Sequence, residues 1–399
     1  MKYVDINNEN NEWMATFRYE ETLDKCFLVL PKQKEIHLLN WEEIPKEISN
    51  HFSRSKLHKS QNYYNSPVKA QIQLTNACNY NCKMCYASSN LYKKQELSLM
   101  DINDLAIKLK KFGVLRVNLV GGEIFMRRDI FEIIEIFKKH HLLVSCITNG
   151  LIPGTTFSKY KELLKEFYAI QVSCNGIKDN YCDEYGFKDW NRAFEAIKNV
   201  YHSCKNATIS FVVTEENIND IPEFFELCFD NNIMHIKFGG VIWTGKSHKE
   251  SANSYYSTVV PYAKALIKQG CEKYPTIDVD SQFDSPITYN KDTFYDNYRK
   301  PDMYISPEGK DSIYIKSNGD IYPFPLLSNN IEFKMGTIHD DFNTIWIANS
   351  KVNELRNITY ADTICSKICH NQICGFWNRS YAYAWSNDLK GKVPCEYDS

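Results

Sequence analysis

From residue 71 onward, short apolar segments alternate with longer segments whose apolar residues recur every three to four positions. The short segments predict strands and the longer ones amphipathic helices. The predicted strands cover residues 71–75, 114–120, 142–148, 168–174, 208–214 and 234–240. The predicted helices cover residues 98–112, 129–140, 157–166, 189–202, 219–231 and 254–273. This alternation is typical of a parallel sheet covered by helices, so we predict an α/β fold with six βα units.

Three cysteines follow the first predicted strand with the spacing Cys78-x3-Cys82-x2-Cys85. Together they can hold three corners of a 4Fe–4S cluster, whose irons normally take four protein ligands. The fourth iron would then be open to another molecule. The alternative is a structural zinc site, which needs a fourth Cys or His at short range. The nearest downstream candidates, His140 and His141, lie beyond a predicted helix, so the cysteines favour the cluster.

This cysteine spacing after a strand resembles that of the radical S-adenosylmethionine (SAM) enzymes, although Met84 stands where the family usually has an aromatic residue. The resemblance implies that the open iron binds SAM and that one electron cleaves it to a 5′-deoxyadenosyl radical, which abstracts hydrogen from a substrate. It makes Cys78, Cys82 and Cys85 the predicted catalytic group. It also implies a partial (β/α)6 barrel, TIM-like, with its chemistry at the carboxyl ends of the strands, and an electron donor such as flavodoxin or ferredoxin.

Residues after the other predicted strands match the same family. The predicted cofactor-binding residues are Gly121, Gly122, Glu123, Ser173, Asn175 and Asn217. The resemblance assigns the Gly-Gly-Glu after the second strand to the amino group of SAM. It places Ser173 and Asn175, after the fourth strand, near the ribose hydroxyls. Asn217, after the fifth, is expected either to face the cofactor or to cap a helix.

The C-terminal part contains a hairpin signal, Asn318-Gly319, and a late group of cysteines. It resembles the SPASM or shorter twitch extension of radical SAM enzymes, with Phe324 where the family has a cysteine. We expect one auxiliary 4Fe–4S cluster there; zinc and no metal at all are the alternatives. Its predicted ligands are Cys365, Cys369, Cys374 and Cys395.

The predicted domains are an N-terminal extension (1–65), the radical SAM barrel (66–280) and the SPASM/twitch-like module (281–399). Within the extension, residues 26–39 predict two strands around a Pro-Lys-Gln-Lys turn, and residues 40–52 a short helix. Such a unit can recognise a peptide by strand addition. The alternative, which we favour, is that it only packs on the barrel.

Composition excludes several classes of function. The formal charge of −2 gives no reason to expect nucleic acid or an anionic membrane as a partner. No apolar run approaches the roughly 18 residues that span a bilayer, and the polar N-terminus is no signal peptide. Fourteen cysteines without a signal sequence point to the cytoplasm, where clustered cysteines indicate metal or catalysis.

The first functional hypothesis is a radical SAM enzyme that matures a ribosomally made peptide, with or without a leader sequence. The expected modification is a thioether or carbon–carbon crosslink, or epimerisation. The run from Gln73 to Ser89 looks most similar to thioether-forming (sactipeptide-type) maturases. The alternatives are radical SAM modification of another protein or a small molecule, of the formylglycine or tetrapyrrole type, and a zinc-stabilised binding protein without turnover.

Overall fold

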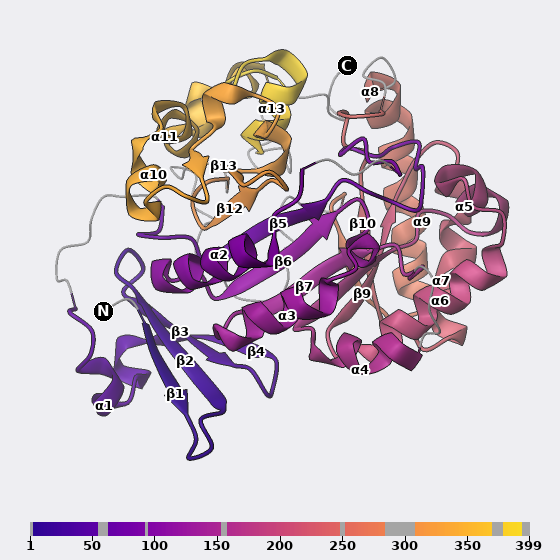
Figure 1. Cartoon of the computed structure of the whole chain (residues 1–399). Coiled ribbons are helices and arrows are strands. Elements are labelled where there is room, and N and C mark those ends of the chain that lie inside the picture. Colours follow the sequence, from indigo (N-terminus) through magenta and orange to yellow (C-terminus); the bar gives the residue numbers. More distant parts are fainter. Residues whose placement is uncertain are drawn as a thin grey trace.

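The computed structural model describes residues 3–54, 63–91, 95–152, 158–247, 252–283, 308–368 and 378–392. Their strands form two sheets (Figure 1). The smaller is antiparallel, with the order β1-β2-β3-β4. Its strands are β1 (Tyr3–Asn7), β2 (Trp13–Glu20), β3 (Lys25–Leu30) and β4 (Glu35–Asn40).

The larger sheet has the order β11-β10-β9-β8-β7-β6-β5-β12-β13-β14. From β11 to β12 every neighbouring pair is parallel, whereas β13 and β14 are added antiparallel. The strands that match the prediction are β5 (Lys69–Thr75), β6 (Arg116–Gly121), β7 (Leu143–Thr148), β8 (Ala169–Ser173), β9 (Ala207–Val212) and β10 (His235–Gly239). The remaining strands are β11 (Asp278–Ser281), β12 (Ser312–Ile315), β13 (Asp320–Tyr322) and β14 (Gly336–Thr337). The predicted α/β fold is confirmed, and the β12–β14 segment joins the same sheet next to β5.

Helices cover the outer face of this sheet (Figure 1). Those of the barrel are α2 (Leu99–Phe112), α3 (Ile130–Lys139), α4 (Ser158–Glu166), α6 (Trp190–Ser203), α7 (Ile221–Asp230), α8 (Ala252–Ser254) and α9 (Val260–Lys273). A π-helical segment, Tyr255–Val259, joins α8 to α9. One barrel helix was not predicted, α5 (Lys178–Tyr185). C-terminal to β14 lie α10 (Phe342–Ala348), α11 (Ser350–Asn357), α12 (Cys365–Ile368) and α13 (Arg379–Ser386).

Helix α2 illustrates how local sequence sets these elements. Ser98 and Asp101 form a capping box, in which each side chain accepts a hydrogen bond from the other's backbone N–H. The helix ends at Gly113, whose φ of 103° lies in the left-handed region that glycine adopts without strain. Its apolar face, which includes Leu105 and Leu109, is buried in the main core. Such a cap contributes about 1 kcal/mol.

The predicted hairpin in the N-terminal extension is confirmed as β3 and β4, but β1 and β2 were not predicted. The helix predicted over residues 40–52 is shorter, a 3₁₀ turn (Trp41–Glu43) followed by α1 (Lys46–Ser49). The unit has a small core of its own, and Phe27 and Val29 of β3 pack against Leu115 and Leu143 at the start of β6 and β7. The extension therefore contacts the amino-terminal ends of the barrel strands.

Asp5 of β1 makes the main polar contact between the extension and the barrel. Its carboxylate lies 2.8 Å from Lys110 Nζ and 3.1 Å from His141 Nδ1, and it also accepts a hydrogen bond from Thr16. Burial alone would raise the pKa of Asp5, but the hydrogen bonds from His141, Lys110 and Thr16 hold the pKa below its usual range. A carboxyl with a lowered pKa stabilises the fold above about pH 4, and this contribution is lost as the pH falls.

We therefore expect Asp5→Asn to lower the free energy of unfolding by about 1–3 kcal/mol at pH 7, because Lys110 is left buried without its charge partner. Denaturant unfolding from pH 3 to 7 measures it, and the difference from the wild type should vanish in acid. The exposed Glu12–Lys32 pair provides the control, since Glu12→Gln should have little effect. A difference for Asp5→Asn that does not depend on pH would contradict this account.

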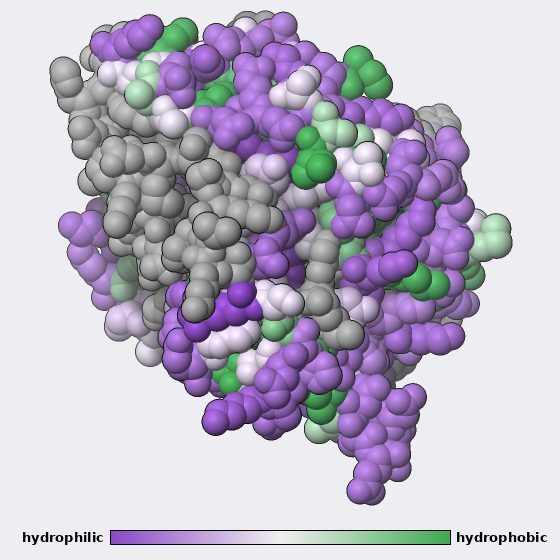
Figure 2. Space-filling model, turned by 90° about the vertical axis from the view of Figure 1, so that its left-hand side faces the viewer, coloured by the Kyte–Doolittle hydropathy of each residue, from purple (hydrophilic) through white to green (hydrophobic). Residues whose placement is uncertain are grey.

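The surface in Figure 2 is mostly hydrophilic, with hydrophobic side chains in small separate patches. Across the described residues, no helix has the length and apolar character needed to cross a membrane.

Candidate functional site: a cysteine-lined cavity at the carboxyl ends of the strands

A cavity of about 440 Å³ lies at the carboxyl ends of the barrel strands, and we call it the upper cavity. Seven of the residues predicted from the sequence line it. They are Cys78, Cys82, Cys85, Gly121, Gly122, Ser173 and Asn175. Phe324, Leu326 and Tyr381 from the C-terminal part of the chain also line it. The parallel strands thus bring together residues that lie far apart in the sequence, as expected for strand ends that meet at one edge.

The loop that carries the three cysteines is attached to α5. The backbone N–H groups of Asn81 and Lys83 donate to the carbonyls of Tyr185 and Glu184, and Met84 N–H donates to the Glu184 carboxylate. Tyr80, in the same loop, packs its ring 5.0 Å from that of Tyr185. Sequence reasoning missed α5. The available signal was Gly186, whose left-handed conformation ends the helix.

A second anchor comes from the loop after β10, to which the sequence assigned no role. Lys246 Nζ donates to Asn81 Oδ1 at 2.7 Å and to the Ser89 carbonyl at 3.3 Å, and Lys246 N–H donates to the Cys85 carbonyl at 3.2 Å. Beside it, a Cβ on Gly245 would lie 2.5 Å from the Cys85 carbonyl oxygen, and the φ of Gly245 is 69°. Glycine is therefore required here so that the two loops can touch.

The thiols themselves fit an iron–sulfur cluster. Burial raises the pKa of Cys78 to about 11, and burial together with the charges of Cys85 and Cys78 raises the pKa of Cys82. Thiolates at these positions therefore need a nearby cationic group to be stable. Backbone N–H groups point at two sulfurs: Tyr80 N lies 3.4 Å from Cys78 Sγ, and Ser89 N lies 3.4 Å from Cys85 Sγ. Such hydrogen bonds to sulfur tune iron–sulfur clusters.

Within the described residues, no three His, Cys, Asp or Glu side chains are gathered to hold a single metal ion. A 4Fe–4S cluster does not require its ligands to converge on one ion, because each thiolate binds a different iron. Cys78, Cys82 and Cys85 fit this arrangement, because all three line one cavity.

Gly121 and Gly122 connect the end of β6 to the start of the cysteine loop. Gly122 N–H donates to the Thr75 carbonyl at 2.9 Å, and Glu123 N–H donates to the Ala77 carbonyl at 2.8 Å. A Cβ on Gly121 would lie 2.6 Å from the Thr75 oxygen, and one on Gly122 would lie 2.2 Å from the Ala77 oxygen. The two glycines allow this close approach of backbone to backbone.

Glu123 lies behind the wall of the upper cavity rather than in it, and its side chain is fully buried. Its carboxylate accepts hydrogen bonds from the Thr148 hydroxyl (2.9 Å), Asn149 N–H (2.8 Å) and Phe125 N–H (3.1 Å). Burial raises its pKa to about 7 in spite of these bonds. In this structure Glu123 therefore joins the ends of β6 and β7. Its predicted contact with SAM stays a prediction.

Ser173 and Asn175 line the upper cavity after β8. The Asn175 side chain is already engaged, since its Oδ1 accepts from Val212 N–H at 2.8 Å and its Nδ2 lies 3.9 Å from Met84 Sδ. Tyr185 also lines the cavity, and its hydroxyl accepts a hydrogen bond from Asn175 N–H at 3.1 Å.

Asn217 does not line the upper cavity. Its Oδ1 accepts from Thr214 N–H at 2.7 Å, and its Nδ2 donates to the Val212 carbonyl at 2.9 Å. It stands at the N-cap position of a 3₁₀ turn (Ile218–Asp220) but makes no side-chain cap bond to that turn. Asn217 thus closes the turn after β9.

Of the four predicted auxiliary-cluster ligands, Cys365 begins α12 and is half-buried. Cys369, Cys374 and Cys395 lie outside the described residues. Phe324, where the related extension has a cysteine, lines the upper cavity.

Comparison with known proteins shows which family this part of the chain resembles. Residues 72–228 match the model of the radical SAM superfamily, a segment that contains the cysteine loop and the ends of β5 to β9. The matched segment is thus similar to radical SAM domains, a superfamily whose members use a 4Fe–4S cluster and SAM as cofactors.

Among curated relatives, the mycofactocin maturase MftC of Mycolicibacterium smegmatis is 30% identical over 41% of this chain and 42% of its own. The sporulation killing factor maturation protein SkfB of Bacillus subtilis is 27% identical over 45% and 44%. The chain spans about half the length of the curated relatives it matches first. Among solved structures, Streptococcus suis SuiB bound to its precursor peptide SuiA has a TM-score of 0.67 at 16% identity, covering 96% of this chain and 97% of SuiB. This last likeness concerns the fold.

We expect Lys246→Met to loosen the cysteine loop, because the substitution keeps the length of the side chain but removes its donors to Asn81 and Ser89. Loss of hydrogen bonds from a charged group of this kind should shift the equilibrium between the held and the loosened loop roughly tenfold. After anaerobic reconstitution, the variant should lose iron to a chelator about tenfold faster than the wild type. Lys165→Met, which removes an exposed lysine of α4, is the control. Equal rates of iron loss would show that Lys246 does not hold the loop.

Proposed function

We propose that this protein is a radical SAM enzyme that modifies a ribosomally synthesised peptide. The observation that carries the proposal is the set of three cysteines lining one cavity at the strand ends, with two loops anchored around them. The peptide as substrate is supported by the relatives, since MftC and SkfB are described as maturases and SuiB has been crystallised with a precursor peptide.

In this proposal, Cys78, Cys82 and Cys85 hold the cluster, and SAM binds beside it in the upper cavity. The bound cluster and SAM supply a 5′-deoxyadenosyl radical. The chain's own residues bind and orient. Gly121 and Gly122 allow backbone groups to approach the cofactor, as glycines do where a ligand comes close to the main chain.

The side chains around the upper cavity determine which residue of a peptide can be presented there. Tyr80 and Tyr185 supply an aromatic wall behind the cysteine loop, and Phe324 and Tyr381 supply one from the C-terminal part of the chain. This lining excludes water from one side of the cavity and suits a side chain or backbone segment that packs against rings. The bond formed in the peptide, whether a crosslink or an epimerised centre, stays a prediction.

The second cluster is a further proposal that rests on the sequence spacing of Cys365, Cys369, Cys374 and Cys395. If all four bind, the cube has no open iron and serves electron transfer or structure. Anaerobic reconstitution should then give about eight irons per chain. Iron content unchanged by Cys365→Ala with Cys369→Ala would contradict it.

The test of the proposed function has two stages. Reconstituted protein with dithionite and SAM should form 5′-deoxyadenosine. Co-expression with a candidate precursor peptide, sought as a short coding frame beside this gene, should then change the mass of that peptide. Deoxyadenosine without any change in peptide mass would favour the alternative of another protein or a small molecule as substrate. A zinc-containing, colourless protein that forms no deoxyadenosine would contradict the proposal.

A further inference from the structure

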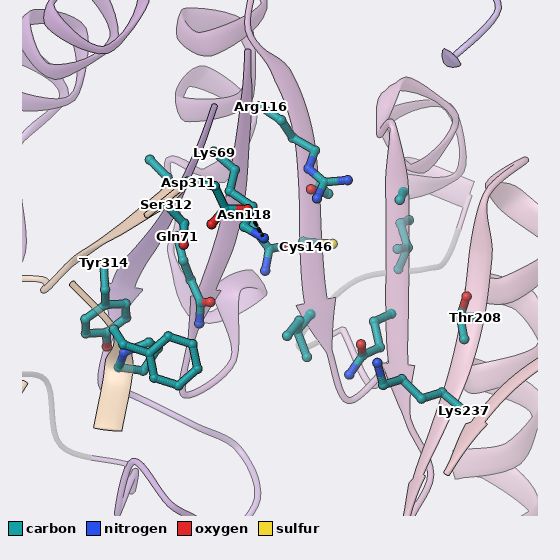
Figure 3. A pocket seen from close by; sticks show the side chains of 18 of the residues that line it. Lys69, Gln71, Arg116, Asn118, Cys146, Thr208, Lys237, Asp311, Ser312 and Tyr314 are labelled. Atoms are coloured by element: carbon teal, nitrogen blue, oxygen red, sulfur yellow. Dashed lines mark ion pairs between the residues drawn. The ribbon is translucent and has the colours of Figure 1, made fainter. Parts of the chain in front are cut away.

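A second cavity, of about 460 Å³, lies at the amino-terminal end of the same barrel, and we call it the lower cavity (Figure 3). Its wall includes residues from every strand from β5 to β12. It shares six wall residues with the upper cavity, and these are Gln71, Ile147, Gln171, Lys237, Phe324 and Pro325. The two cavities are therefore adjacent parts of one barrel interior.

Polar side chains line the lower cavity at positions where a packed barrel would have aliphatic ones. Gln71 and Asn118 are register partners on β5 and β6, and Gln171 and Thr208 are register partners on β8 and β9. Their neighbours along each strand are buried aliphatic residues of the core. These neighbours are Ala70, Ile72, Val117, Leu119, Ile170, Val172, Ala207 and Ile209. A closed (β/α)8 barrel is usually filled by branched aliphatic side chains. The present sheet is open, with β11 and β14 at its edges, and polar side chains line the space inside it.

The four polar groups have no hydrogen-bond partner among the described residues. The side chains of Gln71, Asn118, Gln171 and Thr208 are half-buried and make no hydrogen bond to any part of the chain that the structure describes. Figure 3 shows Gln71 and Asn118 projecting from adjacent strands. Each Asn or Gln offers both an N–H donor and a carbonyl acceptor. A ligand that carries donors and acceptors in alternation would satisfy them, and polypeptide backbone is such a ligand.

The charges in the lower cavity are largely paired with each other. The pairs are Lys69–Asp311 at 3.2 Å, Lys237–Asp280 at 3.0 Å and His235–Asp278 at 3.5 Å. Arg116 and Glu308 add one further charge of each sign. Because cations and carboxylates nearly balance, the wall favours neither an anion nor a cation. This balance agrees with an uncharged polar ligand such as peptide backbone.

We propose that the lower cavity binds an extended segment of the substrate peptide through its backbone, with Gln71, Asn118 and Gln171 as the hydrogen-bonding residues. This inference rests on the proposed function and adds to it a binding site for the part of the peptide that flanks the modified residue. A segment seated there continues into the upper cavity past the wall residues that the two share. Recognition by backbone also means that this site tolerates different side chains.

The probe is a fluorescein-labelled pool of twelve-residue peptides with randomised side chains, whose binding is followed by fluorescence anisotropy. Asn118→Leu and Gln171→Met, which keep side-chain size, should each weaken binding about three- to tenfold, as expected for loss of a hydrogen bond. Together they should weaken it more than about tenfold. Gln269→Met, on the exposed face of α9, is the matched control and should bind as the wild type does.

A second measurement uses only the wild type. A pool with N-methylated backbone amides keeps its side chains but lacks the N–H donors, and it should bind at least about tenfold more weakly than the unmodified pool. Equal binding of the two pools, no binding to the wild type, or no effect of the two substitutions would overturn the inference. Deoxyadenosine formation without peptide is measured in parallel. Its absence from the wild type refutes the proposed function whether or not the pool binds.

Discussion

Replacing Cys78, Cys82 and Cys85 together with alanine is expected to abolish deoxyadenosine formation and remove about four irons per chain, because each thiolate is a ligand of one iron. The activity should fall by at least about a thousandfold, since no other group in the upper cavity can take over this role. Iron analysis and chromatography of deoxyadenosine after anaerobic reconstitution measure both effects.

The control for this variant is Cys26→Ala together with Cys228→Ala. Both are fully buried thiols that do not line the upper cavity, one in the core of the N-terminal extension and one in α7. Loss of these thiols should cost stability but leave the iron content unchanged. If the triple variant still formed deoxyadenosine, the assignment of the cluster to this loop would be wrong.

Gly122→Ala is the second substitution with a large expected effect. The added Cβ would lie 2.2 Å from the Ala77 carbonyl oxygen, and backbone cannot move aside as a flexible side chain does. We expect the cysteine loop to separate from β6, with loss of the hydrogen bonds from Gly122 to Thr75 and from Glu123 to Ala77. The free energy of unfolding should fall by about 1–3 kcal/mol. SAM binding should weaken at least about tenfold, measured by calorimetry on the reconstituted protein.

Gly240 offers a matched control. It also lines the upper cavity, but a Cβ there meets nothing closer than 3.4 Å, an ordinary contact with the Tyr255 hydroxyl. Gly240→Ala should therefore change stability and SAM affinity far less than Gly122→Ala. Similar losses of stability and SAM affinity in both variants would mean that any added methyl group in this cavity is harmful. The close backbone contact between Gly122 and Ala77 would then not be the cause.

Periodicity was sufficient to predict the six barrel strands and most of their helices, because each has a buried face that repeats in the sequence. It was insufficient for α5, where eight residues are largely polar on one side and are held by contacts with the cysteine loop. It also missed β11, a strand of four residues that owes its place to pairing with β10. It predicted β12 only as one arm of the hairpin around Asn318-Gly319 and not as a neighbour of β5. Short strands carry too little pattern to be recognised alone.

The candidate site divides in the same way. The cysteines could be identified from their spacing, and the glycines because the absence of a side chain is itself their role. Glu123 and Asn217 also followed the expected strands, yet both lie outside the upper cavity and bind neighbouring backbone. A motif predicts that a polar residue lies at a strand end. The orientation of its side chain depends on the hydrogen-bond partners that lie nearby only after folding. Lys246 had no signal in the sequence because Asn81, its partner, is 165 residues away.

The sequence by itself determined the parallel α/β fold and the loop with three cysteines, since both follow from local pattern and residue type. The tertiary structure alone decided how that loop is held. Tyr185 at the end of α5, Lys246 after β10 and Gly122 after β6 contact it from three separate segments. It also decided that the barrel interior below the loop is polar, because only the arrangement of the strands from β5 to β12 around one cavity determines which side chains line it. Contacts between distant segments carry no periodicity, and they exist only once the chain has folded.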